Sequence, residues 1–161
     1  MTNSVWTFPY STRYYLTHPW KWFKQLWRNC RDAYRRARHG WTYTDVWDWD
    51  QWFISTAVPM LRYLADHSTA YPGQGEFDTP EKWENWLHHM ADLLESGGEE
   101  WQEAHNEYYD EYMKEPIDFN APPSELFHKY AARAKELSDE GEANIIEALM
   151  QIGKNFYSLW D

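Results

Sequence analysis

Residues 17–40 read THPWKWFKQLWRNCRDAYRRARHG, and this stretch decides the fold class. Thr17 is a typical N-cap, Pro19 suits the first turn of a helix, and Gly40 is typical of the residue just past a helix end. Between them, apolar residues recur at steps of three and four, the period of an α-helix. These residues are Trp20, Phe23, Trp27, Cys30, Tyr34 and Ala37. We expect this aromatic row to be the buried face of a helix.

A basic row follows the same steps one residue later. It consists of Lys21, Lys24, Arg28, Arg31, Arg35 and Arg38. One residue corresponds to about 100° around a helix, so the basic row flanks the aromatic row. Guanidinium groups beside aromatic rings can stack on a nucleotide and neutralise it. The alternative is that this basic helix docks on acidic helices of the chain itself or of a second copy.

The rest of the chain carries many helix signals and almost no strand signals. We expect a second helix from Thr44 that contains Pro59, and a third from Thr79 to the Gly97-Gly98 pair. A fourth is expected over residues 99–114. A proline-rich loop then precedes a final helical region. This region is either one helix or two helices separated near Gly141.

The apolar spacing of these later helices predicts their buried faces. The predicted positions are Val46, Trp49, Phe53, Ala57, Met60 or Leu61, Leu64, Trp83, Trp86 or Leu87, Met90, Leu94, Trp101, Tyr108, Tyr112, Leu126, Tyr130, Leu137, Ile145, Leu149, Ile152, Phe156 and Leu159. The sequence therefore predicts an all-α protein with five to six helices in a single aromatic-rich, bundle-like domain, residues 1–161. Residues 1–16 are expected to form an N-terminal extension.

The amino-acid composition also predicts a binding surface. The 161 residues include 12 Trp, 12 Tyr and 7 Phe, or 19% aromatic residues. Aromatic rings bury large areas, and one monomer is not expected to bury all 31 of them. We therefore predict that some rings lie on a binding surface and that the chain forms a homo-oligomer. The single cysteine, Cys30, suits a reducing compartment. No signal peptide or membrane span is apparent, so we expect a cytoplasmic protein without a membrane partner.

Charge is distributed unevenly along the chain, whose formal net charge is −11. Residues 1–40 hold eight basic side chains against one acid, Asp32. Residues 76–118 hold fourteen acids against Lys82 and Lys114. This asymmetry suggests a nucleotide site at the basic end, or an acidic surface that imitates DNA and competes for a basic partner.

Two carboxylate pairs resemble a catalytic motif. Glu81-x-x-Glu84 and Glu107-x-x-Asp110 are similar to the ExxE…ExxD arrangement of all-α nucleotide pyrophosphatases. In that family, carboxylates from facing helices hold Mg²⁺ against a nucleoside triphosphate, so the resemblance implies Mg²⁺ as cofactor. The small apolar residues that surround the family's acids are missing here. If the chain is not such a pyrophosphatase, we expect no cofactor.

The chain has seven histidines, and two of them lie at spacings that metal ligands use. Glu84, His88 and Asp92 share one helix face, and Glu125-x-x-His128 has the spacing of one di-iron ligand pair. A di-iron bundle needs two such pairs, and only one is present. We therefore interpret the histidines as flanking a solvated acidic face, and no metal site is predicted.

A second group of candidate binding residues surrounds the segment Gly40-Trp41 to Asp50. Its acids are interpreted as helix-dipole partners and arginine acceptors, or as the lining of a pocket. The candidate ligand-binding residues are Arg28, Arg31, Arg35, Trp41, Asp45, Trp47 and Tyr71.

The same segment carries a family resemblance. The pattern of Gly40-Trp41, Asp45-Val46-Trp47-Asp48, Tyr71-Pro72 and Leu159-Trp160-Asp161 resembles a family of small, uncharacterised proteins of tailed bacteriophages. The resemblance implies a phage protein acting in the bacterial host cytoplasm, but no activity can be transferred residue by residue. Phage accessory proteins of this size are often inhibitors of host defence.

The sequence leaves several functions open. We expect a binding protein rather than an enzyme: a counter-defence factor that sequesters a nucleotide signal or blocks a host defence protein. The alternatives are the Mg²⁺-dependent pyrophosphatase, with Glu81, Glu84, Glu107 and Asp110 as its catalytic residues, and the acidic DNA mimic. The sequence neither supports nor excludes a virion component.

Overall fold

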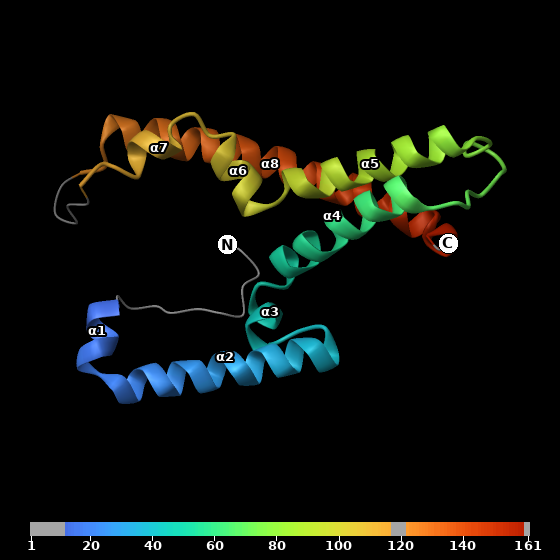
Figure 1. Cartoon of the computed structure of the whole chain (residues 1–161). Coiled ribbons are helices and arrows are strands. Elements are labelled where there is room, and N and C mark those ends of the chain that lie inside the picture. Colours follow the sequence, from blue (N-terminus) through green and yellow to red (C-terminus); the bar gives the residue numbers. More distant parts are fainter. Residues whose placement is uncertain (1–11, 117–121, 160–161) are drawn as a thin grey trace. The chain divides into compact units, whose positions relative to one another are not determined.

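The structure is a computed structural model that describes residues 12–116 and 122–159. Apart from one isolated bridge between Gln74 and Phe77, the regular structure of these residues is helical. The elements are α1 (Thr12–Thr17), α2 (Pro19–His39), α3 (Tyr43–Trp47), α4 (Trp49–His67), α5 (Pro80–Ser96), α6 (Glu99–Ala104), α7 (Tyr109–Tyr112), α8 (Glu125–Lys154) and the 3₁₀ helix η1 (Phe156–Ser158) (Figure 1). The all-α prediction is confirmed. The described helices slightly outnumber the expected five to six because several are only one or two turns long.

Contacts along the chain define two compact units, residues 1–52 and 53–161. The boundary falls inside α4, after Trp52. The single domain predicted from the sequence stays a prediction. Of the predicted N-terminal extension, residues 12–16 belong to α1, and residues 1–11 lie outside the described part.

In the first unit, α2 follows its expected bounds but not its expected burial. The helix begins at Pro19 after His18, while Thr17 ends α1 and donates its hydroxyl to the carbonyl of Tyr14 at 2.9 Å. The predicted buried row is wrong, because its members are exposed, whereas the polar Gln25 and Asn29 are buried. A helical period identifies which residues share a face, but it does not identify which face meets the rest of the protein.

The second helix begins earlier than predicted and is interrupted. Thr42 is the N-cap of α3, and its backbone N–H donates to Asp45 Oδ2 at 2.6 Å. Asp48 forms a turn before α4 begins. Val46 and Trp49, which were expected in the core, are exposed.

The second unit has its core between α4, α5 and α8. On α4 the buried residues are Ile54, Val58, Leu61 and Ala65, mostly one position later than predicted. The predicted Phe53, Ala57 and Leu64 pack against this core only in part, and Met60 is exposed. On α5 the prediction is confirmed, because Trp83, Leu87, Met90 and Leu94 are buried.

Two glycines allow α5 and α8 to approach closely where they cross. A Cβ atom on Gly141 would lie 2.8 Å from the Ser96 carbonyl oxygen and 3.0 Å from the Gly97 Cα. Beside the crossing, Asn144 Nδ2 donates to Ser96 Oγ at 2.9 Å. Gly141 therefore lies inside one continuous helix, α8, and does not divide it; its role is to leave room for the neighbouring backbone.

The predicted helix over residues 99–114 is two short helices. Between them Asn106 is buried, and its side chain donates to the Tyr130 carbonyl at 3.2 Å and accepts from the Tyr108 N–H at 3.1 Å. α6 and α7 follow the N-terminal half of α8, and α5 follows its C-terminal half (Figure 1). Tyr112 stacks on Tyr130 with ring centroids 4.4 Å apart.

The predicted core face of α8 is confirmed only in part. Leu137 is buried, as expected. Leu149 and Phe156 are exposed, and Ala148 occupies the buried position instead. None of the described helices is both long and apolar enough to cross a membrane.

Candidate functional site

The candidate site is the outer surface of α2, where large rings lie exposed. Trp20, Trp27 and Tyr34 are 79%, 72% and 62% exposed, and Phe23 lies between them, also exposed. Residues two positions apart lie about 200° apart around a helix, so the buried Asn29 is almost opposite Trp27. Gln25 Nε2 donates to Asn29 Oδ1 at 3.0 Å on that inner side. The helix therefore presents its aromatic row outward and its polar row inward.

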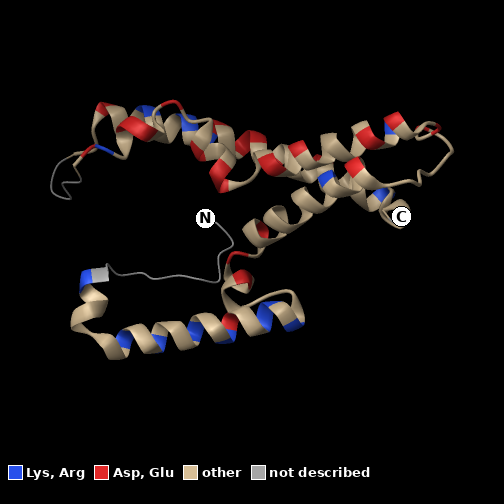
Figure 2. Ribbon diagram, viewed as in Figure 1, with Lys and Arg blue, Asp and Glu red and all other residues tan. Residues whose placement is uncertain are grey.

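The two edges of the aromatic row differ in charge. Along one edge lie Lys21, Lys24, Arg28, Arg31, Arg35 and Arg38, and Figure 2 shows this series of basic residues along α2. On the other side, the row itself ends in the small residues Cys30 and Ala37, and Leu26 and Ala33 lie beyond them. The surface is thus an apolar ridge with positive charge on one side only.

The three arginines predicted to bind a ligand lie on this edge, and each has a local partner. Arg28 donates to the Gln25 side chain, and Arg31 pairs with Asp32 at 3.2 Å. The Arg35 guanidinium lies over the Tyr43 ring, 4.4 Å from its centroid. The Arg31–Asp32 contact is an exposed ion pair, and such pairs are weak, so the charge of Arg31 remains available to an acidic partner. Arg35 is half-buried, and its Nη1 is buried without a hydrogen-bond partner.

Asp45 has a structural role in this unit. It is buried, its Oδ2 accepts from Thr42 N–H, and its Oδ1 pairs with Arg36. This pair ties α3 to α2, which agrees with the interpretation of Asp45 as an arginine acceptor rather than a ligand group. Asp45 is therefore a weak candidate for direct contact with a ligand.

The other predicted pocket residues belong to different units. Trp41 and Trp47 are exposed, and Trp41 contacts Tyr43 edge-on with ring centroids 6.5 Å apart. Tyr71 belongs to the second unit, where it lies in the loop between α4 and α5.

The two carboxylate pairs of the pyrophosphatase reading do not face each other. Trp86, two residues after Glu84 on α5, donates to Gln151 at 3.2 Å, whereas Glu107 pairs with Arg133 at 3.2 Å. Eighteen residues separate these two points on α8, which is about 27 Å along the helix. The chain does not fold back on α5 after Gly97-Gly98, because α6 and α7 continue along α8 (Figure 1).

Within these pairs, the members have different surroundings. Glu81 is exposed at the start of α5. Glu107 and Asp110 line a shallow hollow together with Glu100 and Glu103. A hydrogen bond to Glu103 raises the pKa of Tyr109 at the same hollow above its ordinary value.

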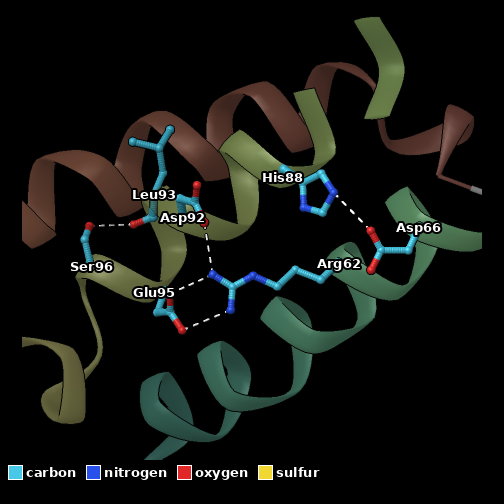
Figure 3. A network of polar contacts seen from close by, with 7 residues as sticks. All are labelled: Arg62, Asp66, His88, Asp92, Leu93, Glu95 and Ser96. Atoms are coloured by element: carbon cyan, nitrogen blue, oxygen red, sulfur yellow. Dashed lines mark hydrogen bonds and ion pairs between the residues drawn. The ribbon is translucent and has the colours of Figure 1, made fainter. Parts of the chain in front are cut away.

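In the structure, the residues considered as metal ligands have partners other than those suggested by their spacing in the sequence. Asp92 accepts from Arg62 at 2.9 Å, and Glu95 accepts from Arg62 at 2.7 Å (Figure 3). These bonds raise the pKa of Arg62 above its ordinary value. His88 instead faces Asp66 of α4, with 3.1 Å between His88 Nε2 and Asp66 Oδ1. Glu125 pairs with Lys129 at 2.7 Å rather than with His128.

Sequence reasoning missed Gln25, Asn29 and Asp66. Gln25 and Asn29 could have been recognised from the sequence, because two amide side chains four residues apart lie on the same helix face, opposite the aromatic row. Asp66 carried no local signal, since its neighbour His88 is 22 residues away.

Comparison of the chain with protein-family models, curated proteins and solved structures finds no match.

Proposed function

We propose that this chain is a non-catalytic binding protein that inserts the aromatic face of α2 into an apolar groove of a partner protein. The observation that supports this proposal is the row of exposed rings at positions 20, 23, 27 and 34. Anchors at steps of three and four along one helix face are the usual way in which an amphipathic helix occupies a groove. Trp, Tyr and Arg are also the residues that most often dominate binding energy at interfaces.

The charge pattern defines the chemistry of the partner. Because Lys and Arg border only one edge of the row, the matching groove has carboxylates along one wall and apolar groups along the other. A helix that lies flat on a membrane typically has basic residues on its whole polar side. Here the polar side opposite the rings is buried through Gln25 and Asn29, which favours a protein groove.

A nucleotide is the less favoured occupant of this surface. Small-molecule sites are concave and enclose most of their ligand, whereas the rings of α2 stand on the convex face of one helix. The resemblance to tailed-phage proteins implies a phage protein in the host cytoplasm, and phage accessory proteins of this size are often inhibitors of host defence. We therefore propose a host defence protein as the partner, which binding blocks. In that reading the protein is a counter-defence factor.

The partner can be found by site-specific photo-cross-linking in bacteria that produce the full chain. A benzophenone-bearing residue at position 27 should cross-link to one protein partner. The same residue at position 157 is the control, because Tyr157 is even more exposed than Trp27 but belongs to the second unit. Cross-links confined to the chain itself would overturn the proposal.

Titration of the purified partner then tests the chemistry. Trp27→Ala should weaken binding by about 30-fold or more, the effect of losing a hot-spot ring. Arg28→Glu with Arg31→Glu should weaken it further at low salt, and Tyr157→Ala should leave it unchanged. Binding of the wild-type chain to anionic vesicles or to nucleotides, with loss in Trp27→Ala, would replace the protein partner by that ligand.

A further inference from the structure

A group of three potential metal ligands lies between α4 and α5, in the second unit. Asp66 comes from α4, and Glu84 and His88 come from successive turns of α5. One ligand atom from each residue lies within 4.8 Å of the others. Figure 3 shows His88 and Asp66 pointing toward each other across the two helices.

These distances are close to those of a metal's ligand shell. Zn²⁺ holds imidazole nitrogen and carboxylate oxygen at about 2.0–2.2 Å, which places tetrahedral ligand atoms about 3.4 Å apart. The His88 Nε2 to Asp66 Oδ1 distance is 3.1 Å, so these two atoms already have this spacing. Glu84 requires only a side-chain rotation, because its side chain is exposed.

The helices that carry the ligands are fixed by neighbouring contacts. Leu61 and Ala65 of α4 and Leu87 of α5 are buried in the core beneath the group. About one turn away, Arg62 bonds Glu95 at 2.7 Å and Asp92 at 2.9 Å, which joins α4 to α5. Ligands on rigid elements bind a metal with little loss of freedom.

We propose that Asp66, Glu84 and His88 bind one divalent transition-metal ion, with Zn²⁺ as the best match. One imidazole and two carboxylates suit Zn²⁺ and its first-row neighbours, whereas Mg²⁺ and Ca²⁺ prefer oxygen ligands alone. Three protein ligands leave at least one coordination position for water. Because the ligands come from two helices, the ion clips α4 to α5. All three ligands belong to the second unit, and the proposal does not depend on the function proposed for α2.

The proposal is tested on the chelator-treated full chain with Zn²⁺ and Co²⁺ as probes. Zn²⁺ should bind with one-to-one stoichiometry in calorimetry and raise Tm, because an ion that binds only the folded state stabilises it. Co²⁺ should produce visible absorption bands that Zn²⁺ removes. His88→Gln and Asp66→Asn should each weaken Zn²⁺ binding at least tenfold.

His89→Gln is the matched control, because His89 is exposed on the next position of α5 and is outside the group. It should leave the affinity and the Tm rise unchanged. Far-UV circular dichroism of the metal-free variants checks that each one folds. Zn²⁺ binding that survives both His88→Gln and Asp66→Asn, or no Tm rise at saturating Zn²⁺, would overturn the proposal.

Discussion

At the scale of single residues, the clearest contrast is between two glycines of α8. Gly141 is buried at the crossing with α5, where an added Cβ would meet backbone atoms of Ser96 and Gly97 at 2.8 and 3.0 Å. Gly153 lies on the same helix, and an added Cβ there would have no neighbour within 4 Å. The same substitution should therefore have opposite effects at the two positions.

We expect Gly141→Ala to lower the free energy of unfolding by about 1–3 kcal/mol, because backbone atoms cannot move aside as a flexible side chain can. Gly153→Ala should raise it by up to about 1 kcal/mol, since alanine is the better helix former. Urea unfolding followed by circular dichroism measures both. Equal effects at the two positions would show that α5 and α8 do not cross in close contact at Gly141.

Local chemistry explains which residue-scale predictions were confirmed. Thr79 and Pro80 begin α5, and Gly97 follows its last residue, as expected from capping preferences alone. Asn106 was missed as the breaking point between α6 and α7, because the bond that holds it goes to Tyr130, 24 residues away. Caps can be predicted from neighbours in sequence, whereas turns held by distant contacts cannot.

At the scale of elements, α2 and α5 show why burial is harder to predict than helicity. Both carry tryptophans at helical spacing, and both were predicted to bury them. Trp83 of α5 is 3% exposed, packed beside Phe77 with ring centroids 4.8 Å apart, whereas Trp27 of α2 is 72% exposed. The spacing of the tryptophans is the same in both helices. The helices differ in whether another part of the chain packs against the tryptophans.

This contrast predicts different costs for the same substitution. Trp83→Ala should lower the free energy of unfolding by about 3–5 kcal/mol, as expected for removal of a buried indole. Trp27→Ala should change it by about 0.5 kcal/mol or less, as at an exposed position. Chemical denaturation of each variant, with amide hydrogen exchange to locate the loss, provides the measurement.

The Trp83→Ala and Trp27→Ala variants also test how much of the candidate site could be predicted from the sequence. The sequence predicted two neighbouring rows on one helix, which the structure confirms, but it wrongly assigned the aromatic row to the core. The binding role of the two rows stays a prediction. A loss of several kcal/mol in Trp27→Ala would mean that the chain covers its own rings and that the α2 surface is not free for a partner.

At the scale of the whole molecule, the two units carry opposite net charge. Residues 1–52 hold eight basic side chains and four acids, a formal charge of +4. Residues 53–161 hold seven basic side chains and 22 acids, a formal charge of −15. Figure 2 shows a series of basic residues on α2, and acids spread over α5 to α8 with scattered basic residues among them. Two copies can therefore attract each other through the basic unit of one and the acidic unit of the other.

This complementarity is one candidate basis of the predicted homo-oligomer, beside the surplus of exposed rings, and salt is the most direct test between the two. If opposite charges hold the copies together, the mass measured by sedimentation should fall toward the 19.6 kDa monomer as salt is raised, because the Debye length falls from about 10 Å at 0.1 M to about 3 Å at 1 M. Arg28→Glu with Arg31→Glu should cause the same dissociation already at low salt. If the exposed rings hold the copies instead, salt should not dissociate them, and Trp27→Ala alone should yield the monomer. A chain that is monomeric at every salt concentration would contradict both forms of self-association and leave the α2 surface for a different protein.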